Sequence, residues 1–234
     1  MKLLLDDALA PITSTIGFFE SDIEPLIRAF IEWQSRVLQP LGIEVSERKI
    51  TGPLRAVLSQ LLPLTGPRRT RYLFLPTASA WVAFFDNGAM GTDATSVCMH
   101  LSGLLRCRAL RITVIPHEHV GGRGRYGACT LELFGPKGEP LGYMRTISVV
   151  NDGGSWAFDQ SGTPLPFERL ENYKRRKLIE RFTFEDLREY TAALGLRPFD
   201  EDFYRPESAR LVELTRPKPV GTTDFTLEQV RAHF

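Results

Sequence analysis

Short turn-forming connections between strand-like runs constrain the fold of this chain more than any other feature. The aromatic and β-branched runs 125–135, 141–150 and 155–158 are separated by GPKGEP and NDGG, and a fourth run at 109–115 precedes them. Glycine, proline, asparagine and aspartate favour tight turns, and connections this short join antiparallel neighbours. The pattern predicts an antiparallel meander in this half of the chain.

Helical periodicity flanks these strands on both sides. Apolar residues recur at helical spacing over 22–38, and again in a second helix that begins at Pro53. The segment from Thr183 opens with T-F-E-D, a capping box in which aspartate replaces glutamate, and Gly195 is expected to end that helix. Further strands are predicted at 72–76 and 81–85, and further helices at 92–105, 167–182 and 226–233.

The predicted fold is α+β, with an antiparallel meander of about four to six strands packed against N-terminal and C-terminal helices. Residues 1–195 are expected to form a single α+β domain. Four prolines and few apolar residues over 196–221 indicate an extended arm. Residues 196–234 are therefore predicted to be a Pro-containing C-terminal arm with a short terminal helix.

Composition and charge argue against several classes of protein. The 234 residues carry 29 basic and 28 acidic side chains, so nucleic acid is not expected as a partner. No apolar run approaches the roughly 20 residues that span a bilayer, and the N-terminal leucine run is too short for a signal peptide. Three cysteines without CxxC spacing indicate reduced thiols. We therefore expect a cytoplasmic protein without a membrane segment, a metal or a cofactor.

The stretch WVAFFDNGAMGTDATS at 81–96 combines an aromatic strand, a tight turn and the start of a helix. Asp-Asn-Gly tolerates the left-handed backbone of a sharp turn, and Thr92 or Asp93 is placed to cap the helix that follows. Free N–H groups at such a junction also suit an anion. Because Asp86 and Asp93 would repel a phosphate, and neither GxGxxG nor GK[ST] is present, a structural turn is preferred over a ligand site.

The HEH segment, with His117 and His119, resembles a pair of metal ligands because residues i and i+2 face the same side of a strand. No spacing supplies a third and a fourth ligand, so no metal site is predicted. The GGRGRYG loop that follows carries Arg123 and Arg125. These two arginines are candidates for contact with a partner, because functional residues concentrate on loops.

Two charged segments lie further along the chain. KRRK at 174–177 is expected on a helix, where its side chains spread around the circumference and form no single basic stripe. The consecutive acids Asp200, Glu201 and Asp202 are the first candidates for contact with a protein partner. Charged groups of this kind steer association with a surface of opposite charge.

The run 148–204 contains an NDGG turn, W-x-F-D-x-S-G-x-P-L-P-F-E and F-D-E-D-F-Y, and it resembles a pattern in a family of uncharacterised bacterial proteins. WVAFFDNGAMGTD resembles part of the same pattern. Such proteins are similar to the immunity partners of polymorphic bacterial toxins. The resemblance implies a non-enzymatic protein-binding module that neutralises a cognate toxin, and it supplies no catalytic residue.

The alternative is a small-ligand-binding protein or an enzyme that uses a polar pocket on the sheet. Asp86, Asp93, His117 and Arg123 are the candidate residues for that pocket. The sequence contains no GxSxG or HExxH motif. For this reason binding of a protein partner is the preferred interpretation, and catalysis is the less favoured one.

Overall fold

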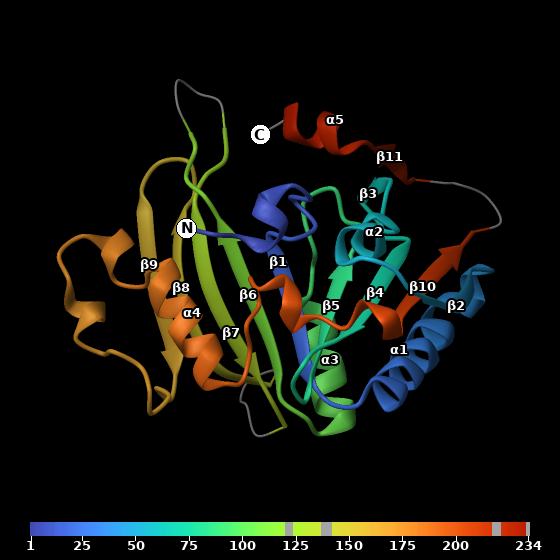
Figure 1. The fold of residues 1–234 in the computed structure, drawn as a ribbon, viewed down its shortest axis with the longest axis horizontal. Coiled ribbons are helices and arrows are strands. Elements are labelled where there is room, and N and C mark those ends of the chain that lie inside the picture. The colour runs from blue at the N-terminus through green and yellow to red at the C-terminus, as the bar shows by residue number, and fades with distance from the viewer. Residues whose placement is uncertain (120–123, 137–141, 217–220, 233–234) are drawn as a thin grey trace.

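An antiparallel sheet of nine strands forms the centre of the protein in the computed structural model, which describes residues 1–119, 124–136, 142–216 and 221–232 (Figure 1). The strand order is β2-β10-β4-β5-β1-β6-β7-β8-β9. The predicted α+β class with an antiparallel sheet is confirmed, and the sheet is larger than expected. The strands are β1 (Thr15–Glu20), β2 (Glu44–Ile50), β4 (Arg71–Pro76), β5 (Trp81–Asp86), β6 (Ala109–Ile115), β7 (Ala128–Phe134), β8 (Tyr143–Asn151), β9 (Trp156–Gly162) and β10 (Ala209–Thr215).

Strands β6 to β9 form the predicted meander, each pairing with the next along the chain. One row of paired residues crosses all four strands and consists of Thr113, Thr130, Ser148 and Asp159. Neighbouring positions such as Leu131 point to the opposite face and join the larger hydrophobic core. Successive side chains of a strand point to opposite faces of the sheet, so polar and apolar positions alternate along these strands.

Three strands that the sequence pattern did not predict complete the sheet. β1 lies between β5 and β6, β10 lies between β2 and β4, and β2 forms one edge. Leu211 and Val212 of β10 face opposite sides of the sheet and are both fully buried, each in a different core cluster. The prediction of an extended arm over 196–221 is therefore wrong at β10, which packs because both of its faces are covered.

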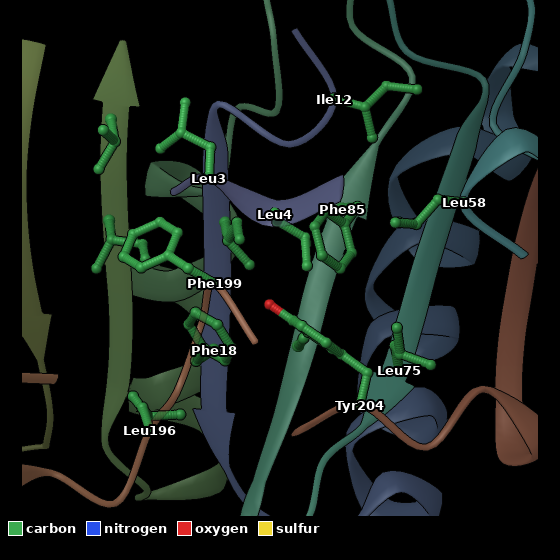
Figure 2. Close-up of a cluster of buried hydrophobic side chains, with 14 of the residues drawn as sticks. Leu3, Leu4, Ile12, Phe18, Leu58, Leu75, Phe85, Leu196, Phe199 and Tyr204 are labelled. Atoms are coloured by element: carbon green, nitrogen blue, oxygen red, sulfur yellow. The ribbon is translucent and has the colours of Figure 1, made fainter. Parts of the chain in front are cut away.

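Helices cover both faces of the sheet. α1 (Ile23–Leu38) and α3 (Thr95–Leu105) pack on one face against a cluster that includes Phe74 and Phe84. The opposite face carries the N-terminal segment, α2 (Leu54–Ser59), α4 (Phe184–Ala193) and the segment that follows α4 (Figure 1). Figure 2 shows how this second layer packs on the strands through Leu3, Leu4, Ile12, Leu58, Leu196, Phe199 and Tyr204 over Phe18, Leu75 and Phe85.

Residues 167–182 do not form the predicted helix. Two single 3₁₀ turns stand in its place, at Asn172–Lys174 and Leu178–Glu180. Arg145 of β8 donates hydrogen bonds of 2.8 and 2.6 Å to Glu168, and both side chains are 0% exposed. Glu168 also accepts hydrogen bonds from the Leu165 N–H and the Tyr173 hydroxyl. A buried charge costs several kcal/mol if it is left unpaired, so the backbone adopts a conformation that brings Glu168 to Arg145. The KRRK segment therefore does not lie in a longer helix.

The predicted capping box of α4 is confirmed. The Thr183 hydroxyl accepts a hydrogen bond from the Asp186 N–H at 3.2 Å, and the Asp186 carboxylate accepts one from the Thr183 N–H at 2.9 Å. Gly195 follows the helix with a positive φ of 83°, a backbone conformation that glycine adopts at low cost. This helix is thus specified at both ends by local sequence.

The predicted cap of α3 is wrong. The N-cap position is Ala94, which provides no side-chain cap. The Thr92 hydroxyl instead accepts a hydrogen bond from the Asp86 N–H and donates one to the Ile12 carbonyl, which joins the N-terminal segment to the end of β5. The terminal helix agrees with its prediction and runs from Leu227 to Ala232 as α5.

Candidate functional site

A cleft of about 1250 Å³ opens at the end of the sheet where β1 begins and β5 and β6 end. The N-terminal turn, the described part of the β6–β7 connection and α5 lie together at this end of the molecule (Figure 1). The turn that follows β5 contributes a further wall. The lining residues are Asp6, Asp7, Ala8, Ala10, Pro11, Ser14, Thr15, Met90, Gly91, Ile115, Glu118, His119, Gly124, Arg125, Tyr126, Arg231 and Ala232.

The floor of the cleft is a left-handed turn in η1 (Leu4–Asp7). Leu5, Asp6 and Asp7 have φ values of 54°, 52° and 62°, three successive positive values without a glycine. Each left-handed residue with a Cβ costs roughly 1–2 kcal/mol relative to a right-handed one. Burial of Leu4 and Leu5 in the larger core anchors the turn against this cost. Backbone strain of this kind is concentrated at functional sites in proteins.

Arg125 connects two walls of the cleft. Its Nη1 donates a hydrogen bond of 2.6 Å to Asp7, and its Nε and Nη2 donate hydrogen bonds of 3.2 and 2.7 Å to Glu118. The backbone carbonyl of Arg125 also accepts a hydrogen bond from the Glu118 N–H. Charge-assisted hydrogen bonds are roughly twice as strong as neutral ones, so this arginine fixes the position of both carboxylates.

The two histidines of HEH both lie near the ring of Tyr126, and the segment follows β6 without being part of a strand. His119 stacks on Tyr126 at a ring-centroid distance of 4.2 Å. His117 accepts a hydrogen bond at Nδ1 from the Gly127 N–H and packs against Trp156 at 5.3 Å. The alternation of faces that suggested a shared metal therefore does not apply here.

Helix α5 closes one side of the cleft through Arg231. The Arg231 Nη2 donates hydrogen bonds to the carbonyl oxygens of Ala8 at 2.8 Å and Asp7 at 3.3 Å. Val230 is buried in the larger core and holds the helix against the body of the protein. Two guanidinium groups from distant parts of the chain thus converge on the same N-terminal turn.

Asp86, at the end of β5, occupies the position where the sequence suggested an anion. Its carboxylate accepts hydrogen bonds from the Gly88 N–H at 2.8 Å and the Asp93 N–H at 2.9 Å, and its side chain is 1% exposed. Burial raises the pKa of Asp86 to about 6, although these hydrogen bonds and Arg69 at 3.8 Å oppose the shift. The chain therefore fills this set of N–H groups with its own carboxylate.

The residues proposed for a small-ligand pocket are only partly brought together. Asp93 lies beside Asp86, and Arg69 reaches both carboxylates at 3.6 and 3.8 Å. His117 lies at the β6–β7 connection, where the Gly127 N–H and Trp156 occupy it. Arg123 lies outside the described residues. The ion pairs among Asp86, Asp93 and Arg69 stabilise the turn after β5.

The acidic segment Asp200, Glu201 and Asp202 lies on the surface and does not line the cleft. Arg197 pairs with Asp200 at 3.3 Å and with Asp202 at 3.2 Å. The segment therefore keeps its exposure, and a neighbouring arginine partly neutralises its charge.

The three cysteine thiols have raised pKa values, whereas an activated nucleophile has a lowered one. Burial raises the pKa of Cys98 and of Cys129 well above the usual range, and it raises the pKa of Cys107 to about 11. A thiol with a raised pKa carries little thiolate near neutral pH. Among the described residues, no three His, Cys, Asp or Glu side chains are grouped closely enough to hold a metal ion.

Comparison of the chain with protein-family models, with curated proteins and with solved structures finds no match. Within the part of the chain that the structure describes, no helix combines the length and the apolar character needed to cross a membrane. The geometry of the cleft consequently carries the functional inference.

Sequence reasoning placed Arg125 among the contact residues but missed Asp7 and Arg231. No local motif marks either of them, because LLDD and VRAH look like ordinary surface sequence. Their roles arise from a left-handed turn without glycine and from a terminal helix that returns to the N-terminus. Both features depend on contacts between residues far apart in the chain.

Proposed function

We propose that this protein is a non-enzymatic protein-binding module that accepts a projecting segment of a partner in the cleft. The carrying observation is the size and lining of that cleft. Its volume of about 1250 Å³ exceeds the roughly 300–1000 Å³ of pockets that enclose small molecules. An open cleft of this size suits a loop or a chain end of another protein.

The residue types around the cleft support this proposal. Met90 is 79% exposed and Tyr126 is 39% exposed, and both line the opening. Tyrosine, methionine and arginine are enriched where proteins bind one another. The ion pairs of Arg125 hold these walls in place before a partner arrives, which lowers the entropic cost of association.

We further propose that the partner is toxin-like and that binding neutralises it, as in the immunity proteins which the sequence resembles. The left-handed turn supports a dedicated binding role, because backbone strain of this kind is concentrated at functional sites. The acidic segment 200–202 remains a second contact candidate at the surface.

A site-specific photo-crosslinking experiment tests the proposal. A benzophenone amino acid replaces Tyr126 in the cleft, and the matched control carries it at Leu104 of α3, which is 57% exposed on the opposite layer. Irradiation in cells that make the protein natively is expected to give one dominant adduct from position 126 and none from position 104. Equal adducts from both positions, or none from position 126, would contradict the proposal.

The contribution of the acidic segment is tested with the partner so identified. Replacement of Asp200, Glu201 and Asp202 by alanine is expected to weaken binding and to reduce its dependence on salt. An unchanged dissociation constant would remove this segment from the interface while leaving the cleft in place.

A further inference from the structure

Acceptor groups of the N-terminal turn bind guanidinium groups of the chain itself as well as backbone N–H groups, and the Asp7 carbonyl oxygen also accepts a hydrogen bond from the Ala10 N–H at 3.1 Å. Arg125 binds the carboxylate of Asp7, and Arg231 binds the carbonyl oxygens of Asp7 and Ala8. These two arginines come from the β6–β7 connection and from α5. These contacts show that oxygen acceptors of the turn bind guanidinium groups.

The charge of the cleft favours a further cation. Among the described residues that line it, Asp6, Asp7 and Glu118 supply three carboxylates against the two guanidinium groups of Arg125 and Arg231. Asp6 is exposed, and its carboxylate makes no hydrogen bond or ion pair within the part of the chain that the structure describes. A carboxylate held at the floor of a cleft attracts a basic side chain of a partner.

The two resident arginines differ in how firmly they are held. Arg125 makes three hydrogen bonds to two carboxylates, whereas Arg231 is exposed and, among the described residues, donates to neutral carbonyl oxygens alone. Hydrogen bonds between two charged groups are the stronger kind. Arg231 is therefore the arginine that a competitor displaces.

We infer that the partner presents an arginine to the turn at Asp6–Ala8, and that Arg231 of α5 occupies this position in the free protein. In the free protein one nitrogen of Arg231, Nη2, donates to both carbonyl oxygens. A guanidinium has further N–H donors for a carboxylate such as that of Asp6, and it is more weakly hydrated than the compact ammonium of lysine. α5 accordingly acts as a resident competitor that partner binding releases. This inference rests on the proposed function, since it names the chemistry of the segment that enters the cleft.

Peptide binding to the ¹⁵N-labelled full-length protein tests the inference by nuclear magnetic resonance. The probe is an acetylated, amidated pentapeptide with one arginine between two pairs of glycines, and matched peptides carry lysine or the neutral isostere citrulline. The arginine peptide is expected to shift the amide signals of Asp6, Asp7 and Ala8 more strongly than the other two. Equal shifts from the lysine peptide, or shifts elsewhere only, would overturn the inference.

Two variants sharpen this test. Arg231→Gln is expected to increase affinity for the arginine peptide by about threefold, the scale of an exposed charged contact. Arg188→Gln, at an exposed position of α4, is expected to leave it unchanged. Asp6→Asn keeps a residue that tolerates positive φ and is expected to weaken binding. An Arg231→Gln variant with wild-type affinity would refute the competitor role.

The crosslinking and peptide experiments distinguish failure of this inference from failure of the proposed function. Crosslinking from position 126 without arginine binding would contradict this inference alone and leave the proposed function in place.

Discussion

Arg125 and Asp7 are separated by 118 positions in the chain, and a hydrogen bond of 2.6 Å joins the guanidinium Nη1 to the carboxylate Oδ2. The bond ties the β6–β7 connection to a turn whose three left-handed residues resist that conformation. Arg125 and Asp7 therefore hold each other in the cleft. Substitutions of Asp7 can separate the contribution of this bond from the cost of the left-handed backbone.

Asp7→Asn and Asp7→Ala are expected to differ in stability. Asparagine tolerates positive φ, so Asp7→Asn loses mainly the charge-assisted bond and lowers the free energy of unfolding by about 1–2 kcal/mol. Asp7→Ala loses the bond and also strains the turn, which adds about 1 kcal/mol. Urea denaturation of both variants measures the difference. Identical midpoints for the two would show that the left-handed backbone contributes no strain.

The buried carboxyl of Asp86 predicts a dependence of stability on pH. Burial raises its pKa from the ordinary 3.8 to about 6, so the folded state binds this proton more tightly than the unfolded state. The stabilising contribution is fully present below pH 3.8 and is lost as the pH rises through about 6. Two pKa units correspond to roughly 3 kcal/mol.

Asp86→Asn removes this titration. The free energy of unfolding of the wild type, taken relative to Asp86→Asn, is expected to fall by roughly 2.5 kcal/mol between pH 4 and pH 7. Asp93→Asn changes the half-exposed carboxylate in the same turn and serves as the matched control. Denaturation curves across this pH range provide the measurement, and a constant difference between wild type and Asp86→Asn would exclude the assignment.

The buried pair of Arg145 and Glu168 predicts a large loss of stability when one partner is neutralised. Glu168→Gln leaves the arginine buried without a counter-charge and is expected to lower the free energy of unfolding by about 3–5 kcal/mol. Glu180→Gln, in the same segment but exposed beside Lys177, is expected to change it by under about 1 kcal/mol. Chemical denaturation distinguishes the two. Similar values for both variants would mean that solvent reaches the Arg145 site.

Two glycines are expected to respond to alanine with opposite sign. A Cβ at Gly88 would lie 2.6 Å from the Gly91 carbonyl oxygen and 3.0 Å from the Asp86 carboxylate, so Gly88→Ala is expected to cost about 1–3 kcal/mol. Gly103 lies within α3 and is exposed, and no atom of the described residues lies within 4 Å of its Cβ position. Gly103→Ala is expected to stabilise the protein by roughly 0.5–1 kcal/mol. Thermal unfolding checks both signs.

Local sequence signals predicted the parts of this fold that local forces determine. The meander followed from its turn residues, α1 from its apolar spacing, and the capping box of α4 from Thr183 and Asp186. The segment 167–182 was misassigned because helical spacing carries no information about Arg145, which lies elsewhere in the sequence and binds Glu168. β10 was missed for a similar reason, since its burial depends on β2 and β4.

The candidate site was harder to predict than the fold. Arg125 was selected because it lies in a glycine-rich loop, which is a local signal. Its partners Asp7 and Glu118, and the approach of Arg231, are properties of the assembled sheet end. For Asp86 the sequence suggested a carboxylate free to bind a ligand. In the structure this carboxylate accepts hydrogen bonds from two N–H groups of its own turn.

The position of β10 has a consequence for how the protein is made. Strands β5, β1 and β6 to β9 all lie within residues 15–162, so a ribosome releases that part of the sheet early. β2 pairs only with β10 among the described strands, and β10 begins at residue 209. A nascent chain therefore carries β2 unpaired, and one edge of β4 open to other chains, until β10 has left the ribosome. Assembly of this half of the sheet is expected to wait for the synthesis of β10, whereas the other half is free to form earlier.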